Sequence, residues 1–274
     1  MLLPVDMTKH LRELYDWLIK EDDVEILPKL VPQLAELTEI FQKIKNVENE
    51  ILAKEKDKER QTKENQFGGG QSHHNSHHNH PGKEDPRAYL DAIVNIGNKL
   101  SANHLWRLEL ILLDGFPRYY VMYNAKDIHE RAIPYLIKRI KEGVNEIRLK
   151  AIEMLVRFMR MNHMNSRSKD LLKAINDEFF ASSCFKMRQA YISIFLKLAE
   201  TFSRHFIKQN VLSSILNLAA DKTAQVRRRL ADILSNIRKM IFLEDTDNLQ
   251  RFNDIVNQLM QDADKEVSDV SIYF

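Results

Sequence analysis

Residues 221–237 read DKTAQVRRRLADILSNI, and this stretch decides the fold. Behind Val226, apolar residues recur at the spacing of one helix face: Leu230, Ile233, Leu234 and Ile237. Asp221 stands five residues before Val226, at a turn that precedes the predicted helix. A carboxylate at this turn can accept N–H groups of the following helix, and it can pair with an arginine of a neighbouring unit. The stretch therefore predicts a helix that stacks against others of its kind.

The same pattern returns along the chain at a period near 40. An apolar residue followed by arginine occurs at Trp106-Arg107, Ile147-Arg148, Met187-Arg188 and Val226-Arg227, and Val267-Ser268 continues the series without the arginine. The position five residues before the apolar one is polar in every unit: Ser101, Glu142, Ser182, Asp221 and Asp262. Amphipathic first helices precede these positions at 88–100, 128–142, 168–180, 205–220 and 247–262. Repeats of two helices at this period are typical of HEAT or armadillo arrays.

Composition agrees with an all-α, HEAT-like α-solenoid of antiparallel helix pairs. Only 7 Gly and 7 Pro punctuate 274 residues, whereas β and α/β folds with glycine loops usually need more breakers. The single Cys184 excludes an internal disulfide framework. The sequence contains no run of 18 apolar residues, and the apolar stretch at its start is too short for a signal peptide. We therefore expect a cytoplasmic protein without a membrane partner.

Three segments are predicted from the change in composition. Residues 1–54 form an N-terminal helical pair, with helices over 6–20 and 23–53. Residues 55–84 form a disordered His-rich linker, because they hold too little apolar area to offset the entropy of ordering. Residues 85–274 form the repeats, about five helix pairs with the last one truncated. We expect Ile147, Met187 and Val226 to be buried between pairs, and Trp106 as well.

Catalytic, metal and cofactor sites are not predicted. The linker holds His73, His74, His77, His78 and His80, but it offers no carboxylate or cysteine at fixed spacing and no scaffold for a metal. No Ser-His-Asp order, glycine loop or HExxH motif supports catalysis. Charge is uneven, since residues 118–240 hold 24 Lys and Arg against 11 Asp and Glu. This excess of +13 would attract an acidic partner.

Residues 182–241 resemble the late repeats of the HEAT-repeat regulatory and scaffold subunits of type 2A-like serine/threonine phosphatases, those of protein phosphatase 4 above all. The matching positions are Arg188, Phe202, His205, Phe206, Asp221, Val226, Arg227 and Leu230. Trp106-Arg107 is similar to a WR pair that opens an earlier helix in the same family. The resemblance covers about 86–270 and implies a non-catalytic subunit that binds a serine/threonine phosphatase catalytic subunit.

The candidate partner-binding residues lie at the turns and at the starts of the second helices. They are Asn103, Trp106, Arg107, Asn145, Arg148, Lys186, Arg188, Gln225, Arg227 and Arg228. The repeated arginines have a structural alternative, in which each pairs with a carboxylate of a neighbouring unit such as Glu142 or Asp221. Two other functions stay open: a HEAT adaptor for a transport or cytoskeletal assembly, and nucleic-acid binding through the basic middle. The last is disfavoured because Arg227, Arg228 and Arg229 cannot share one helix face.

Overall fold

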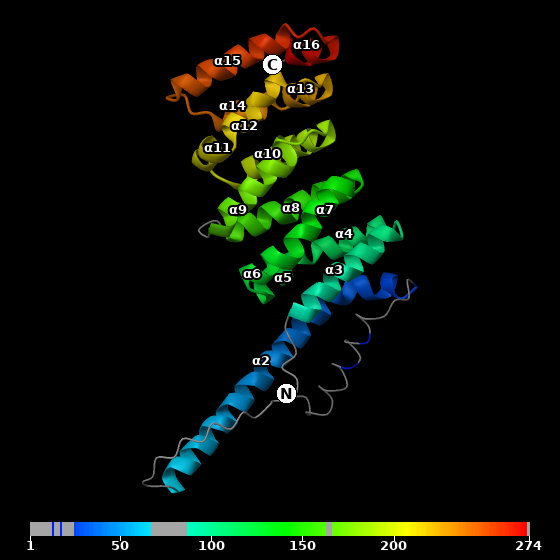
Figure 1. The fold of residues 1–274 in the computed structure, drawn as a ribbon, viewed down its shortest axis with the longest axis vertical. Helices are drawn as coiled ribbons and strands as arrows, with labels where there is room; N and C mark the ends of the chain where they lie inside the picture. Colours follow the sequence, from blue (N-terminus) through cyan, green and yellow to red (C-terminus); the bar gives the residue numbers. More distant parts are fainter. Residues whose placement is uncertain (1–12, 14–16, 18–24, 67–86, 163–165, 273–274) are drawn as a thin grey trace. The chain divides into compact units, whose positions relative to one another are not determined.

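The fold is helical in every part of the chain that the computed structural model describes, residues 13, 17, 25–66, 87–162 and 166–272, where no strand occurs (Figure 1). The all-α prediction is thus confirmed. The chain divides into two compact units, Met1–Ala132 and Ile133–Phe274. Within the described residues, no helix combines the length and the apolar composition that crossing a bilayer requires.

Unit 1 contains the elements α2 (Leu27–Gln66), α3 (Arg87–Ala102), α4 (Trp106–Asp114), α5 (Phe116–Met122), α6 (Ala125–Asp127) and the π-helical turn η1 (Ile128–Ala132). Helix α2 packs against α4 and α5, and α3 packs against α4 and η1. Leu34 of α2 and Leu90 of α3 are fully buried. The predicted helix 6–20 lies outside the described residues, apart from Glu13 and Trp17.

Helix α2 corrects the predicted start of the linker at residue 55. We expected a helix over 23–53 and disorder over 55–84, but α2 continues to Gln66. Residues 54–66 read KEKDKERQTKENQ, which lacks apolar residues and also lacks Gly and Pro. Lys, Glu, Gln and Arg are good helix formers, so helix propensity sustains the element after its apolar stripe has ended. The rest of the predicted linker, 67–84, lies outside the described residues.

Unit 2 contains a longer series of elements, which Figure 1 shows one after another from α7 to α16. They are α7 (Ile133–Glu142), α8 (Asn145–Met161), α9 (Ser166–Ile175), η2 (Asn176–Phe180), α10 (Phe185–Thr201), α11 (Arg204–Asn210), α12 (Leu212–Asn217), η3 (Leu218–Ala220), α13 (Ala224–Ala231), α14 (Leu234–Met240), α15 (Thr246–Met260) and α16 (Lys265–Ile272). The predicted first helices 168–180, 205–220 and 247–262 agree with these bounds within two residues, although the first two are broken by π or 3₁₀ turns. The predicted helix 128–142 is covered by η1 of unit 1 together with α7.

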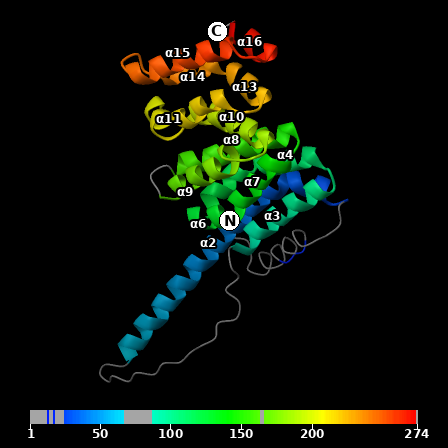
Figure 2. The ribbon, with the colours of Figure 1, turned by 45° about the horizontal axis from the view of Figure 1, so that its top comes forward.

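Packing in unit 2 joins each predicted second helix to the next. Helix α8 packs against its own first helix α7 and against α10, α10 packs against α13, and α13 packs against α16 (Figures 1 and 2). The core of unit 2 contains large apolar side chains that are nearly or wholly excluded from solvent, among them Phe158, Phe179, Tyr191, Phe195 and Phe252. Burial of this apolar surface is the main favourable contribution to the stability of unit 2.

The repeated apolar position is buried in two of the four units where we expected it to be. Ile147 and Val226 are 1% and 0% exposed, as predicted. Met187 is only half-buried, which contradicts the prediction. The first turn of α10 lies at the edge of the packed core, because Ser183 and Cys184 before it are exposed and Phe185 is itself half-buried. An equal place in the repeat therefore does not ensure equal burial.

Candidate partner-binding ridge

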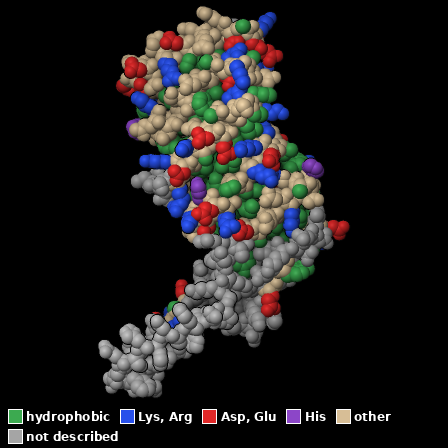
Figure 3. Space-filling model, viewed as in Figure 1, with side chains coloured by type: hydrophobic (Ala, Val, Ile, Leu, Met, Phe, Trp, Pro, Cys, Tyr) green, Lys and Arg blue, Asp and Glu red, His purple; other side chains and the backbone are tan. Residues whose placement is uncertain are grey.

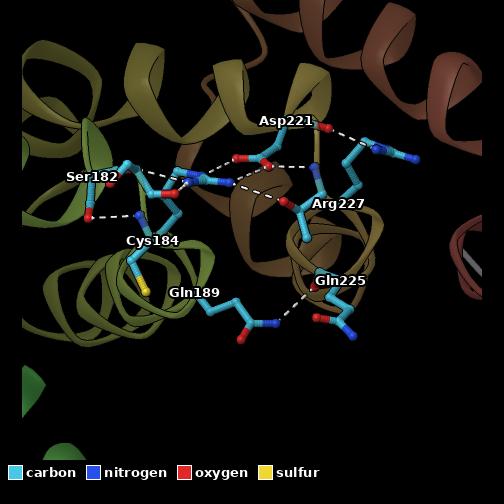
Figure 4. A network of polar contacts seen from close by, with 9 residues as sticks. Ser182, Cys184, Gln189, Asp221, Gln225 and Arg227 are labelled. Carbon is cyan, nitrogen blue, oxygen red and sulfur yellow. Dashed lines mark hydrogen bonds and ion pairs between the residues drawn. The ribbon is translucent and has the colours of Figure 1, made fainter. Parts of the chain in front are cut away.

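Arg188, in the first turn of α10, connects two turns of unit 2. Its Nε and Nη2 donate to Oδ2 and Oδ1 of Asp221 at 2.5 and 2.9 Å, a bidentate contact. Its Nη1 donates to the carbonyl oxygens of Ser182 and Ser183, at 2.8 and 3.0 Å. The two charged side chains are only 8% and 5% exposed, so this is a buried ion pair between successive second-helix starts. Figure 4 shows the network around Asp221, with Ser182 and Cys184 on one side and Arg227 on the other.

Arg227, in the first turn of α13, makes the same contact one repeat later. Its Nε and Nη2 donate to Oδ2 and Oδ1 of Asp262 at 2.6 and 2.7 Å. Its Nη1 donates to the carbonyl oxygen of Asp221 at 2.8 Å. The carboxylates also accept backbone N–H groups, Asp221 from Thr223 and Asp262 from Asp264. The predicted pairing with an arginine of a neighbouring unit is thus confirmed for Asp221 and Asp262. The N–H groups that they accept belong to the residue just before each helix and not to the helix itself.

These contacts change the pKa of both carboxyls. Burial alone would raise the pKa of Asp221, but hydrogen bonds from Arg188 and Thr223 outweigh it, so the pKa lies below its usual value. The hydrogen bond from Arg227 is the main cause that lowers the pKa of Asp262, against the opposing effect of burial. Each carboxylate is therefore held ionised in the folded chain at pH values where an exposed aspartate begins to take up a proton.

We expect the free energy of unfolding to decrease in acid because of these two groups. A lowered pKa in the folded state stabilises the fold above the ordinary carboxyl pKa of about 4, and this stability is lost as the pH falls through the lowered values. Urea titrations between about pH 7 and about pH 3 would measure the slope. In the matched variant with Asp221→Asn and Asp262→Asn, stability should depend less on pH over the acid range. An unchanged slope would contradict the prediction.

Arg188 is buried in unit 2, and Arg227 is half-buried with its guanidinium turned toward Asp262. We had included both among the partner-binding residues, but their guanidinium groups are engaged by Asp221 and Asp262. Arg148 is half-buried and also turned inward, since its Nε donates to the carbonyl oxygen of Ile140 at 3.0 Å and its Nη2 to that of Gly143 at 3.2 Å. The structural alternative holds for Arg188 and Arg227, because a repeated arginine at this position joins successive units.

Three of the predicted residues belong to unit 1. Trp106 is half-buried, not buried as we expected, because it opens α4 at a turn whose residues Asn103 and His104 are exposed. Arg107 is exposed, and its guanidinium lies over the Trp106 ring, 4.4 Å from the ring centroid. The amide of Asn103 donates to the carbonyl oxygen of Lys99 in the last turn of α3.

The exposed members in unit 2 are Asn145, Lys186, Gln225 and Arg228, which we call the turn ridge. Each of them lies in the first two turns of α8, α10 or α13. Apolar side chains accompany the ridge, because Val144 and Leu149 at the start of α8 are 49% and 48% exposed. Figure 3 shows basic and acidic side chains interspersed over the visible face of unit 2. The ridge and the side chains beside it thus form a mixed polar and apolar surface.

One residue of this region, Gln189, was not among the residues predicted from the sequence. The amide of Gln189 donates to the carbonyl oxygen of Gln225 at 3.1 Å, and it joins α10 to α13 (Figure 4). Arg228 forms an ion pair with Glu266 at the start of α16. Gln189 and Arg228 both occupy the position after the repeated arginine, so a comparison of that position between units would have found Gln189. Exposed pairs of this kind contribute little to stability.

A metal centre is not formed by the described residues, which hold no group of three or more His, Cys, Asp or Glu side chains suited to a metal ion. The five predicted linker histidines lie outside the described residues. Cys184 is exposed at the turn before α10.

Comparison with known proteins gives no family for this chain. No family model matches it, and no curated protein matches it. Among solved structures, the chain is similar to a crystal structure of an engineered protein, with 14% identity over 69% of this chain and 82% of that one. The TM-score of 0.35 is too low to support any inference about fold or function. The residues of the structure itself therefore provide the basis for a function.

Proposed function

We propose that the chain is a non-catalytic scaffold of HEAT-like helix pairs, stacked as an α-solenoid, that binds a type 2A-like serine/threonine phosphatase catalytic subunit in the cytoplasm. Protein phosphatase 4 is the first candidate for that catalytic subunit. One observation carries the scaffold: the Arg188–Asp221 and Arg227–Asp262 contacts join successive helix pairs at the same register. The choice of a phosphatase rests on the sequence resemblance over 182–241.

The stacking supports a binding role because some side chains at the starts of the second helices take no part in it and remain exposed. In arrays of helix pairs, each pair contacts its neighbours and the exposed turns form an extended surface. Arg188 and Arg227 are occupied in stacking, whereas Lys186 and Gln225 point to solvent from the same helix turns. We therefore propose the turn ridge, and not the repeated arginines, as the surface that meets the catalytic subunit.

The ridge is tested by charge reversal. Lys186→Glu combined with Arg228→Glu is expected to reduce the association rate with the catalytic subunit about tenfold at low salt, because surface charge steers encounter more than it sets affinity. Loss of the exposed Arg228–Glu266 pair should leave the helix content and Tm nearly unchanged. The matched control is Lys169→Glu with Lys239→Glu, an equal charge change at exposed positions of α9 and α14. Biolayer interferometry with purified type 2A and protein phosphatase 4 catalytic subunits gives the rates.

The possible outcomes distinguish a wrong binding partner from a wrong binding surface. If the unchanged chain binds neither catalytic subunit, the phosphatase proposal is wrong, and the adaptor role in a transport or cytoskeletal assembly takes its place. If the chain binds but the ridge variant and the control associate at the same rate, the ridge is not the site. A salt titration with generic DNA and RNA addresses the third function, since phosphate-driven binding weakens steeply as salt is added.

A further inference from the structure

Ser182 occupies the place that Asp221 and Asp262 occupy in the next two repeats. All three stand at the turn before a second helix, respectively α10, α13 and α16. All three also accept a hydrogen bond from the backbone N–H two residues later: Cys184 N donates to Ser182 Oγ at 3.2 Å, Thr223 N to Asp221 Oδ1 at 2.8 Å and Asp264 N to Asp262 Oδ1 at 2.9 Å. The backbone therefore holds the Ser182 side chain as it holds the two carboxylates.

Arg148 occupies the place of Arg188 and Arg227. Helix α8 packs against α10 as α10 packs against α13 and α13 against α16. Arg188 and Arg227 reach forward to the carboxylate of the next turn, whereas Arg148 donates backward to the carbonyl oxygens of Ile140 and Gly143. The next turn for Arg148 is that of Ser182, whose hydroxyl bears no charge. This difference of one residue explains why the arginine contact is made twice in the series and not at α8.

We infer that Ser182 is a phosphorylation site, and that its phosphate takes the place of the missing carboxylate and pairs with Arg148. A phosphoserine is anionic and reaches one bond further from Cβ than an aspartate carboxylate, so it extends toward the guanidinium from the turn. A covalently attached phosphate needs no binding from solution, which favours it over an acidic partner side chain at the same place. This inference is independent of the proposed phosphatase partner.

The surroundings of Ser182 favour a phosphate. The 17-residue helix α10 begins three residues later, at Phe185, and unsatisfied N–H groups at such an end stabilise negative charge. Lys186 is exposed in the first turn of α10, and Arg188 already donates to the Ser182 carbonyl oxygen. The nearby acidic side chain of Glu178 is engaged by Lys141, at 2.5 Å.

A kinase can reach this turn. Ser182 is half-buried, Ser183 and Cys184 are exposed, and the segment between Phe180 and Phe185 is not helical. The step transfers the γ-phosphoryl group of ATP to Ser182 Oγ. The new P–O bond forms as the bond between the γ-phosphorus and its bridging oxygen breaks, ADP leaves with that bonding pair, and the hydroxyl proton passes to a base of the kinase.

The consequence is tested in the full chain with phosphoserine inserted at position 182 during translation. We expect Tm to rise by roughly 2–4 °C and amide exchange to slow at the starts of α8 and α10. Phosphoserine at position 183 is the matched control, because it adds the same charge one residue away from the register of Asp221 and Asp262. Arg148→Gln should remove the gain from phosphoserine 182 without altering the effect of phosphoserine 183.

Two results would overturn the inference. One is an equal Tm change for phosphoserine at 182 and at 183. The other is a gain that persists in the Arg148→Gln background. The modification itself is tested by expressing the chain in eukaryotic cells treated with a phosphatase inhibitor and mapping phosphate by mass spectrometry. We expect phosphate on Ser182 at higher occupancy than on Ser183, and its complete absence from Ser182 would exclude the modification.

Discussion

Replacing Asp221 with alanine is expected to lower the free energy of unfolding by about 3–5 kcal/mol. The substitution leaves the Arg188 guanidinium buried without its counter-charge, and an uncompensated buried charge is strongly destabilising. The effect should lie nearer the lower value, because Arg188 keeps its bonds to the carbonyl oxygens of Ser182 and Ser183. Urea unfolding followed by circular dichroism would measure the change.

Two further variants distinguish the cost of leaving a buried charge unpaired from the cost of losing an ion-pair contact. Arg188→Met combined with Asp221→Leu removes both charges and should recover much of the lost stability, because an apolar pair of similar volume can replace a buried ion pair. Arg228→Ala breaks the exposed pair with Glu266 and should change stability little. If Asp221→Ala were as mild as Arg228→Ala, the contact between α10 and the turn before α13 would not be a stacking contact.

Replacing Ile147 with alanine is expected to lower the free energy of unfolding by about 2–5 kcal/mol. Ile147 lies in the first turn of α8, and its side chain is 1% exposed. Truncation therefore removes buried apolar area and leaves a cavity. The same urea experiment measures the loss, provided that the variant remains helical at zero denaturant.

Met187→Ala is the matched control for this effect, because Met187 has the same place in the repeat but is half-buried. Its truncation should cost clearly less than that of Ile147, since solvent already reaches the side chain. Equal losses would mean that place in the repeat, and not burial, determines the cost.

The helices could be predicted from the sequence because their signals are local. The apolar spacing over 88–100 and 247–262 predicted α3 (Arg87–Ala102) and α15 (Thr246–Met260) to within two residues. The contact partners of the repeated arginines were also predictable in kind, because a carboxylate recurs at a fixed distance before each of the last two second helices. The periodicity of a helix and the position of its first turn depend on residues that are close together in the chain, so both can be read from the sequence.

The end of α2 was not predicted, because two local signals disagreed there. Residues 54–66 lack the apolar residues that a packed helix needs, and this absence pointed to disorder. Their helix propensity is nevertheless high, and the structure follows propensity to Gln66. Absence of an apolar face shows that a segment does not pack, which is a different property from absence of helix.

By itself, the sequence determined the all-helical class, the bounds of most first helices to within two residues and the turn position that holds Asp221 and Asp262. Only the tertiary structure decided which members of one repeated position are buried. Ile147 and Met187 look alike in the pattern, and so do Arg148 and Arg188, yet they differ in exposure or in partner. The reason is physical: burial and ion pairing depend on the side chains of the adjacent helix pair, which lie 33–38 residues away in the chain, and not on the periodicity of the helix that carries them.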